Sequence, residues 1–299
     1  MAEFRSGFVT IIGRPNVGKS TLLNRMVGQK VAIMSDKPQT TRNKIQGVFT
    51  HPDYQIVFID TPGIHKPKHK LGEYMVEQAK SALAEVDCVL YVYDITQAFG
   101  TGEEYILQLL ETVETPVLLV INKIDLVPKE TLLPFIQEMH ERFSFREIVP
   151  VSAVTGENID RLLEVIKNYL PEGPQYYPEG MVTDQPEQFI MAEIIREKVL
   201  QLTREEVPHS VAVKIEELIP RSQHLVYVGA VIYLERESQK GIIIGKQGQM
   251  LKQIGQLARQ EIESLLGGKI YLDLRVKVKP SWRRREEELK TLGYVLEKE

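Results

Sequence analysis

The sequence predicts an α/β domain built on a mostly parallel sheet, followed by a smaller α+β domain. Over roughly the first 170 residues, short β-rich runs alternate with helical stretches, which is typical of βαβ units with helices on both faces of a sheet. A turn-rich segment with three prolines and two glycines, residues 171–180, then ends this alternation. A different order of elements follows it. We therefore expect a first domain at residues 1–173, a linker at 174–183 and a second domain at 184–299.

The first domain contains six β-rich runs, at residues 8–12, 45–49, 55–59, 89–93, 117–121 and 148–151. The second and third runs are separated by little more than residues 51–54, which is too short for a crossover helix. These two strands should form a hairpin, which leaves one antiparallel strand at the edge of the sheet. Helical periodicity appears between the runs, as at 103–110 and 159–170.

The composition is that of an ordinary globular protein, with 43% apolar and 26% charged residues. The single cysteine, Cys88, excludes an internal disulfide and a multi-cysteine zinc site, and it fits a reducing compartment. No secretory signal is visible, and no apolar stretch approaches the roughly 20 residues of a spanning helix. We expect a cytoplasmic protein. The net charge of −4 does not suggest nucleic acid for the chain as a whole.

A phosphate-binding loop follows the first β-rich run and opens a helix. Its residues are Gly13-Arg14-Pro15-Asn16-Val17-Gly18-Lys19-Ser20, continued by Thr21. Glycines let the backbone wrap around a phosphate, and N–H groups at a helix N-terminus bind the anion. In this pattern Lys19 contacts the β- and γ-phosphates, and the hydroxyl of Ser20 is a ligand of Mg²⁺.

Two further segments are expected to complete the phosphate and magnesium site. Asp60-Thr61-Pro62-Gly63 ends the third β-rich run; there a carboxylate can hold a Mg²⁺-bound water, and the N–H of Gly63 can reach the γ-phosphate. The polar segment 37–42 has no periodicity and resembles a switch loop. We expect its Thr41, in preference to Thr40, to complete the magnesium shell.

The base is predicted by Asn122-Lys123-Ile124-Asp125, which follows the fifth run. The carboxylate of Asp125 can accept hydrogen bonds from guanine N1–H and the 2-amino group, neither of which adenine offers. Ser152-Ala153, after the sixth run, can supply a backbone N–H to guanine O6. These motifs together indicate GTP and GDP as ligands and hydrolysis of GTP as the activity. Ile64 follows Gly63 and cannot orient a water molecule, so unaided hydrolysis should be slow.

The second domain combines a glycine loop with a local positive charge. Helix 187–204, strands 211–218 and 225–235, helix 248–266 and strand 270–278 are the expected elements, with a final helix at 282–292. This order is that of a type II KH domain. Residues 240–285 hold eleven Lys and Arg against three acidic residues, which suggests a polyanion footprint.

The expected RNA-binding residues lie in this basic region. They are Gly245, Lys246, Gln247, Gly248, Lys252, Lys277, Lys279, Trp282, Arg283 and Arg284. The two glycines would bring backbone close to phosphates, as in a KH loop. Trp282 with the arginines after it could stack bases. The alternative for this tail is a helix with internal ion pairs in which Trp282 is a packing anchor.

GRPNVGKST, the QTTR loop, DTPG, NKID, SA and the loop IIIGKQG together resemble the Era family of bacterial GTPases over essentially the whole chain. The resemblance implies catalytic roles for Lys19, Thr41, Asp60, Gly63 and Asn16, the last through an activating K⁺ ion. It implies binding of the single-stranded 3′ end of 16S ribosomal RNA, gated by the nucleotide, and assistance in assembly of the 30S subunit. It further implies peripheral association with the inner face of the cell membrane. No stable DNA partner is expected.

Two other functions compete with this one. The first is a signalling GTPase whose C-terminal domain binds a protein or the membrane. The second is an RNA-binding protein with a vestigial nucleotide site, but Lys19, Ser20 and Asp60 are all intact.

Overall fold

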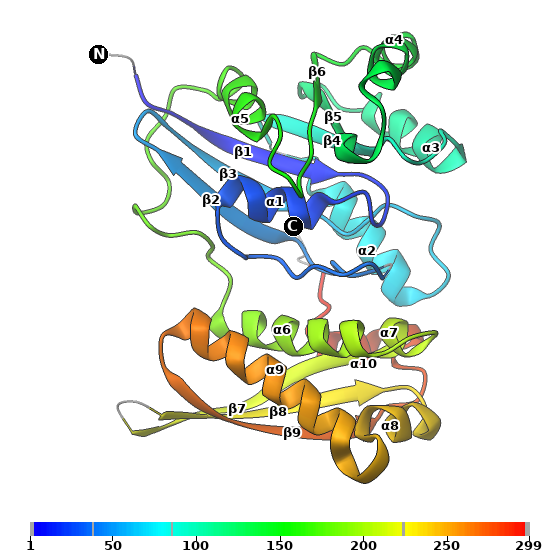
Figure 1. Cartoon of the computed structure of the whole chain (residues 1–299), viewed down its shortest axis with the longest axis vertical. Coiled ribbons are helices and arrows are strands. Elements are labelled where there is room, and N and C mark those ends of the chain that lie inside the picture. Colours follow the sequence, from blue (N-terminus) through cyan, green and yellow to red (C-terminus); the bar gives the residue numbers. More distant parts are fainter. Residues whose placement is uncertain (1–2, 38, 85, 223–224, 297–299) are drawn as a thin grey trace. The chain divides into compact units, whose positions relative to one another are not determined.

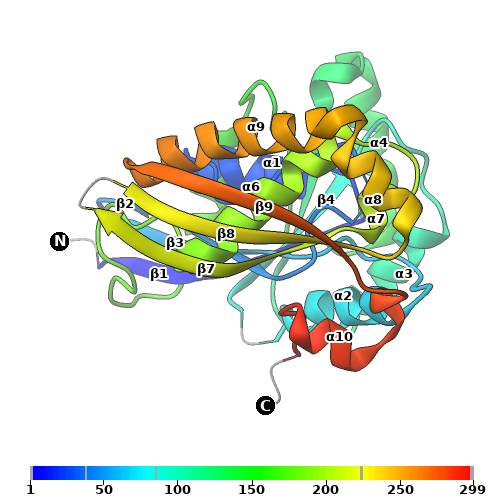
Figure 2. The ribbon, with the colours of Figure 1, turned by 90° about the horizontal axis from the view of Figure 1, so that it is seen from below.

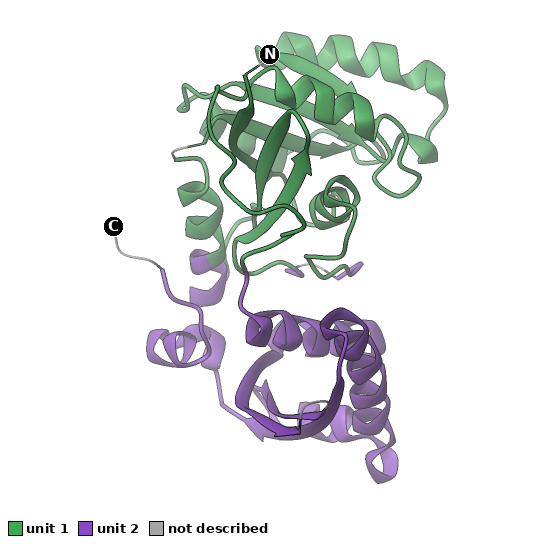
Figure 3. Ribbon diagram, turned by 90° about the vertical axis from the view of Figure 1, so that its left-hand side faces the viewer, with its two compact units in different colours: residues 1–34, 41–67, 75–184 green, residues 35–40, 68–74, 185–299 purple. Residues whose placement is uncertain are grey.

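The computed structural model describes residues 3–37, 39–84, 86–222 and 225–296; Pro38 of the expected switch loop lies outside them. The chain divides into two compact units (Figure 3). Unit 1 comprises residues 1–34, 41–67 and 75–184, and unit 2 comprises 35–40, 68–74 and 185–299. None of the helices in the described ranges combines the length and apolar composition needed to cross a bilayer.

Unit 1 contains a six-stranded sheet in the order β2-β3-β1-β4-β5-β6 (Figure 1). Its strands are β1 (Arg5–Ile12), β2 (Ile45–His51), β3 (Tyr54–Asp60), β4 (Cys88–Asp94), β5 (Val117–Asn122) and β6 (Glu147–Pro150). All neighbouring strands run parallel except β2 and β3, which form an antiparallel hairpin. The expected mixed sheet with one antiparallel edge strand is confirmed.

Helices cover both faces of this sheet, because the strands are apolar on both sides. The helices are α1 (Lys19–Val27), α2 (Lys70–Ser81, of which residues 75–81 belong to unit 1), α3 (Thr101–Leu110), α4 (Leu132–Arg142) and α5 (Ile159–Lys167), with short 3₁₀ turns at Ile124–Leu126 and Lys129–Thr131. Side chains of α2, α3 and α4 share one core cluster with β4 and β5. Every residue of β4 is buried, and Cys88 is a buried free thiol.

The segment 174–183, expected as a linker, is bonded to the edge of the unit 1 sheet. Gln55 of β3 accepts hydrogen bonds from the backbone N–H groups of Tyr176 and Tyr177 at 2.8 and 2.9 Å. The N–H of Val48 in β2 donates to the carbonyl of Val182 at 2.8 Å. This stretch therefore extends the edge of unit 1.

Unit 2 contains a three-stranded sheet in the order β7-β8-β9. Its strands are β7 (Ala212–Ser222), β8 (Leu225–Leu234) and β9 (Lys269–Val278), with β7–β8 antiparallel and β8–β9 parallel. Helices α6 (Glu187–Leu202) and α9 (Gln249–Leu266) lie on one face, and Figure 2 shows the opposite face without a covering helix. The expected α+β architecture is confirmed.

Three details of unit 2 differ from the sequence expectation. Helix α8 (Glu237–Ile244), which was not among the expected elements, contains the apolar run Ile242–Ile244. Gln239 caps the start of this helix by accepting hydrogen bonds from the N–H groups of Glu235 and Arg236. A short helix, α7 (Val207–Ser210), precedes β7. The final helix is split into a 3₁₀ turn at Trp282–Arg284 and α10 (Glu286–Thr291).

Candidate nucleotide-binding site and nucleic-acid groove

The phosphate-binding loop has the backbone that its glycines predict. It leaves β1 at Gly13 with φ 155° and enters α1 after Gly18 with φ 99°, values that side-chain-bearing residues rarely adopt. A Cβ atom on Gly18 would lie 2.3 Å from Nδ2 of Asn122. Glycine is therefore required at position 18 for its conformation and for the close approach of β5.

Lys19 is buried at the start of α1, with 6% of its surface exposed. Its Nζ donates to the carbonyls of Gly13 at 3.3 Å and Arg14 at 2.9 Å. Burial lowers the pKa of Lys19 from 10.5 to about 8, partly offset by the charge of Asp60. An ammonium in this position is stabilised by an added anion, which fits its expected contact with phosphates.

Three oxygen-bearing side chains from distant parts of the sequence converge beside the loop. Ser20 Oγ lies 2.9 Å from Thr41 Oγ1 and donates to Asp60 Oδ2 at 2.7 Å, and Thr41 Oγ1 donates to the same oxygen at 3.4 Å. The hydroxyl of Thr40 instead donates to the carbonyl of Lys37 at 2.6 Å. The structure thus brings together the three expected magnesium residues and places Thr41, not Thr40, among them.

Asp60 has the properties expected of a residue that holds a cation. It is fully buried, and its Oδ1 accepts no hydrogen bond from the described residues. Burial raises the pKa of Asp60, against the opposing charge of Lys19. An unsatisfied buried carboxylate oxygen next to two hydroxyls is an all-oxygen set of the kind that Mg²⁺ prefers, so these residues fit the ion.

The segment after β3 packs tightly against the phosphate-binding loop. A Cβ atom on Gly63 would lie 2.6 Å from the backbone nitrogen of Pro15, and the N–H of Ile64 donates to the carbonyl of Gly13 at 3.0 Å. The side chain of Ile64 is 2% exposed within the core of unit 1. Since it is apolar and buried, Ile64 cannot orient water, as the sequence predicted. His65 Nδ1 lies 2.8 Å from the carbonyl oxygen of Gly63.

Asn122 and Lys123 hold the loops around the expected base site rather than standing free. Asn122 accepts the N–H of Ala153 at 3.0 Å and donates to the carbonyl of Val17 at 2.8 Å. Lys123 Nζ donates to the carbonyl of Asn16 at 2.9 Å. Asp125 is exposed in the 3₁₀ turn after β5, where a ligand can reach it.

The expected backbone contact with guanine O6 stays a prediction. We expected Ser152-Ala153 to offer a backbone N–H to guanine O6, but the N–H of Ala153 is engaged by Asn122. A contact with O6 would have to share this hydrogen. The cause is the parallel register of β5 and β6, which places Asn122 at the same sheet edge as the loop after β6.

Three further residues position the site and were not predicted from the sequence. Asp94 accepts a hydrogen bond from Lys123 Nζ at 2.6 Å, Glu103 pairs with Arg14 at 3.2 Å, and Arg25 Nε donates to the carbonyl of Ala153 at 3.1 Å. The place of Asp94 could have been predicted, because Asp94 ends the buried strand β4 and is paired with Asn122 at the end of β5. The other two lie within helices, and no sequence signal separates them from ordinary surface charges.

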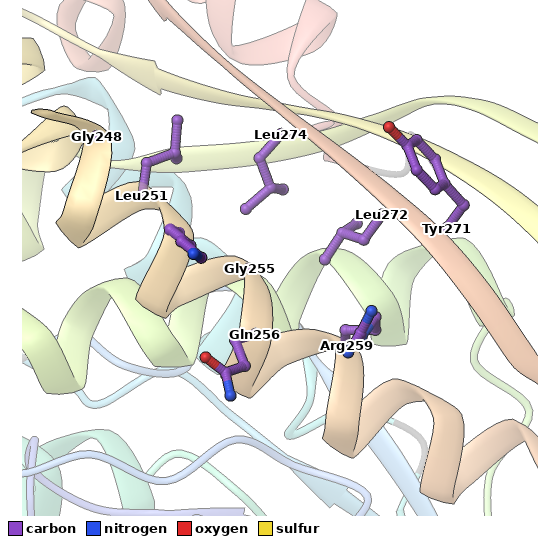
Figure 4. Close-up of a pocket in the computed structure, with 9 residues that line it drawn as sticks. Gly248, Leu251, Gly255, Gln256, Arg259, Tyr271, Leu272 and Leu274 are labelled. Carbon is purple, nitrogen blue, oxygen red and sulfur yellow. The ribbon is translucent and has the colours of Figure 1, made fainter.

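Unit 2 carries a groove between α9 and β9 next to the glycine loop (Figure 4). The groove has a volume of about 510 Å³. Gly248, Lys252 and Arg259 line it from the helix side, and Leu272 and Leu274 line it from the strand side. Gly245 and Gly248 both have positive φ, 71° and 77°. A cationic rim over an apolar floor beside a glycine loop fits single-stranded nucleic acid.

The expected RNA-binding residues fall into two groups. Gly248 and Lys252 line the groove, and Lys246 and Gln247 lie in the turn between Gly245 and Gly248. The residues farther along the chain are mostly engaged elsewhere. Lys277 pairs with Glu216 at 3.3 Å, Lys279 with Glu288, and Arg283 donates to Glu235 at 3.0 Å, whereas Arg284 is exposed.

Trp282 is not a stacking platform for bases. It is fully buried, its indole N–H donates to the carbonyl of Ser210 at 2.9 Å, and its ring stacks on Tyr294 with centroids 5.8 Å apart. The alternative interpretation of Trp282 as a packing anchor is therefore correct. The prediction that Trp282 binds RNA is wrong. The sequence does not show whether an aromatic residue next to arginines packs into the core or faces the solvent.

This fold and these loops define a P-loop GTPase joined to a KH domain. Family models agree: the model described as "50S ribosome-binding GTPase" matches residues 8–123, and that of the KH domain matches residues 206–283. A single-substitution variant of Aquifex aeolicus Era bound to GDP·AlF4⁻ is 48% identical, with a TM-score of 0.95, over 98% of this chain and 100% of that one. Era in complex with MgGDPNP and nucleotides 1506–1542 of 16S ribosomal RNA is also 48% identical over the same shares, with a TM-score of 0.96. This chain belongs to the Era family of GTPases.

Proposed function

We propose that this GTPase binds the single-stranded 3′ region of 16S ribosomal RNA under control of its nucleotide state and assists assembly of the 30S subunit. One observation carries the proposal: the three oxygen-bearing side chains expected to hold Mg²⁺ beside the phosphate-binding loop and a groove with a KH-type glycine loop occur in the same chain. The homologous Era structure contains both MgGDPNP and an RNA fragment from that region.

The proposed catalytic site follows from the geometry of unit 1. Ser20 and Thr41 would hold Mg²⁺ directly and Asp60 would hold it through a bound water; the ion neutralises charge on the β- and γ-phosphates when bound. Lys19 would contact the same phosphates, and the N–H of Gly63 would contact the γ-phosphate. Asp125 would recognise guanine, with Asn122 and Lys123 holding the surrounding loops in place.

A K⁺ ion near Asn16 is a further part of the proposal. Asn16 is exposed in the phosphate-binding loop with φ 65°, so the loop presents this residue at the surface where the phosphates bind. Since Ile64 is buried and apolar, it cannot orient the attacking water, and additional positive charge near the γ-phosphate is another way to stabilise the transition state. An ion held by Asn16 would supply it.

The proposed RNA site consists of the groove and the loop from Gly245 to Gly248, with Lys246 and Lys252 as phosphate contacts. We further propose a domain division at 1–173, 174–183 and 184–299 and a cytoplasmic location, which the single buried Cys88 supports. Peripheral association with the membrane is supported only by the family resemblance.

The test compares RNA affinities of the full-length protein loaded with GDPNP or GDP. The probes are the RNA fragment 1506–1542, a scrambled RNA of the same length and DNA of the same sequence. We expect the matched RNA to bind most tightly, the affinity to depend on the nucleotide, and GTP hydrolysis to stop when Mg²⁺ is removed. Equal binding of all three probes, or none, would refute the RNA function and favour the signalling GTPase.

A further inference from the structure

Two tyrosines form a stacked pair on the face of the unit 2 sheet that no described helix covers. Tyr227 of β8 and Tyr271 of β9 lie directly opposite each other in the parallel register. Their ring centroids are 5.9 Å apart, and the rings are 16° from parallel. The guanidinium of Arg221 lies over the Tyr227 ring, 5.3 Å from its centroid. Arg221, Tyr227 and Tyr271 thus form a short stack that ends at the edge strand.

The inner member of this stack is held rigidly. The hydroxyl of Tyr227 donates to Asp273 Oδ2 at 3.0 Å, and Arg275 donates to the same oxygen at 3.0 Å. Tyr271, at the open end, remains 62% exposed. An aromatic ring fixed by a stacked neighbour and exposed to solvent can accept another planar group at little cost in side-chain entropy.

This open end adjoins the candidate RNA groove. Leu272 and Leu274 point from β9 into the groove, whereas Tyr271 projects from the other side of the strand (Figure 4). Tyr271 nevertheless contributes to the groove wall. A strand of RNA lying between α9 and β9 therefore has only the width of one edge strand to cross before it reaches the ring of Tyr271.

We propose that Tyr271 stacks a nucleobase of the RNA strand where that strand leaves the α9–β9 groove and passes over β9. The proposal rests on the RNA function proposed above and adds a contact outside the groove. The surroundings favour a single base over a protein partner, because ion pairs such as Lys277–Glu216 and Arg275–Asp273 flank the rings. These leave no broad apolar area for a protein interface to bury.

The test uses the full-length protein with GDPNP and the RNA fragment 1506–1542. Tyr271→Leu keeps an apolar side chain but removes the ring, and Tyr271→Phe keeps the ring. We expect Tyr271→Leu to weaken RNA binding about tenfold, with Tyr271→Phe within about twofold of the original protein. The slope of log affinity against log salt should not change, because no phosphate contact is lost. Tyr105→Ala, at an exposed tyrosine of α3 in unit 1, is the matched control.

The outcomes separate this proposal from the RNA function itself. Normal binding by Tyr271→Leu, while Gly248→Asp in the groove loop still weakens binding, refutes the stacking role alone. Failure of the unsubstituted protein to prefer the matched RNA refutes both. If Tyr271→Leu also lowers the thermal midpoint, its loss of RNA binding could follow from unfolding. Ultraviolet crosslinking of RNA to the unsubstituted protein then tests the stacking contact directly. A crosslink mapped to Tyr271 by mass spectrometry supports the proposal, and crosslinks confined to the groove overturn it.

Discussion

The side-chain oxygen of Asn122 accepts a hydrogen bond from the backbone N–H of Ala153 at 3.0 Å, while its amide donates to the carbonyl of Val17 at 2.8 Å. One side chain at the end of β5 therefore joins the phosphate-binding loop to the loop after β6. Asn122 is 2% exposed, so neither bond can be replaced by bulk water.

Asn122→Ala should loosen both loops at once. The change leaves a buried N–H and a buried carbonyl without partners, which should lower the free energy of unfolding of the nucleotide-free protein by about 2–4 kcal/mol. Affinity for GDP and GTP should fall as well. Asn168→Ala, at an exposed amide after α5, is the control. Urea unfolding and nucleotide titration check the prediction, and unchanged stability would show that Asn122 does not tie the loops together.

Asp125→Asn should shift the nucleotide preference from GTP toward xanthosine triphosphate. The amide can donate a hydrogen bond to the oxygen on carbon 2 of xanthine, where guanine carries an amino group. Affinities of the variant for both nucleotides measure the shift, with Asp160→Asn on α5 as an exposed control. A variant that keeps its preference for GTP would remove Asp125 from the base site.

Hydrolysis should be faster in K⁺ than in Na⁺, and loss of the Asn16 side chain should erase the difference. Asn16→Gly is the better variant, because glycine tolerates φ 65° and alanine does not. Initial rates of phosphate release in the two salts give the answer. Equal rates of the unsubstituted protein in K⁺ and in Na⁺ would contradict activation by K⁺. Ile64→Val serves as a mild control, since Ile64→Ala would open a cavity in the core.

Binding of GDP should take up protons near pH 8. Lys19 has a pKa of about 8 in the nucleotide-free protein, and bound phosphates raise it. Net proton uptake should therefore accompany GDP binding at pH 8, and affinity should fall as the pH rises above 8. Calorimetry in two buffers of different ionisation enthalpy measures the uptake. The Lys19→Arg variant should show no proton uptake, because arginine does not titrate in this range. Proton release by the unsubstituted protein would contradict the contact between Lys19 and the phosphates.

Gly248→Asp should weaken RNA binding without affecting GTP affinity. A Cβ atom on Gly248 meets open space, whereas one on Gly245 would lie 2.7 Å from Cβ of Met250, so only position 248 tests the loop without a clash. Gly267→Asp, at the other end of α9 with φ 66° and equal space, matches it in strain and charge. Normal RNA binding by a folded Gly248→Asp would refute the loop assignment.

Lys246→Ala should act on the same site through charge alone. Loss of one phosphate contact lowers affinity similarly for many RNA sequences and reduces the salt slope by about one. Titrations at several salt concentrations, with matched and scrambled RNA, measure both quantities. An unchanged slope would mean that Lys246 does not touch a phosphate.

The amino-acid sequence alone predicted the fold class of both units, the loop expected to bind phosphate, the three side chains expected to hold magnesium and the glycine loop beside the groove. These features depend on local order along the chain: apolar runs of strand length, glycines where φ is positive, and motifs in a required sequence. Even the convergence of Ser20, Thr41 and Asp60 follows from the predicted sheet: β1 and β3 run parallel and end at one edge. The antiparallel strand β2 begins at that same edge, just after Thr41.

Which neighbour each polar or aromatic side chain contacts depends on how the segments pack in three dimensions. Trp282 is buried against Tyr294, Ala153 donates to Asn122, and Tyr271 stacks on Tyr227. The partners in these contacts are 12, 31 and 44 residues apart in the sequence. Whether a ring turns inward or outward depends on how strands and helices pack, because burial is set by contacts between segments and not by the composition of any one of them.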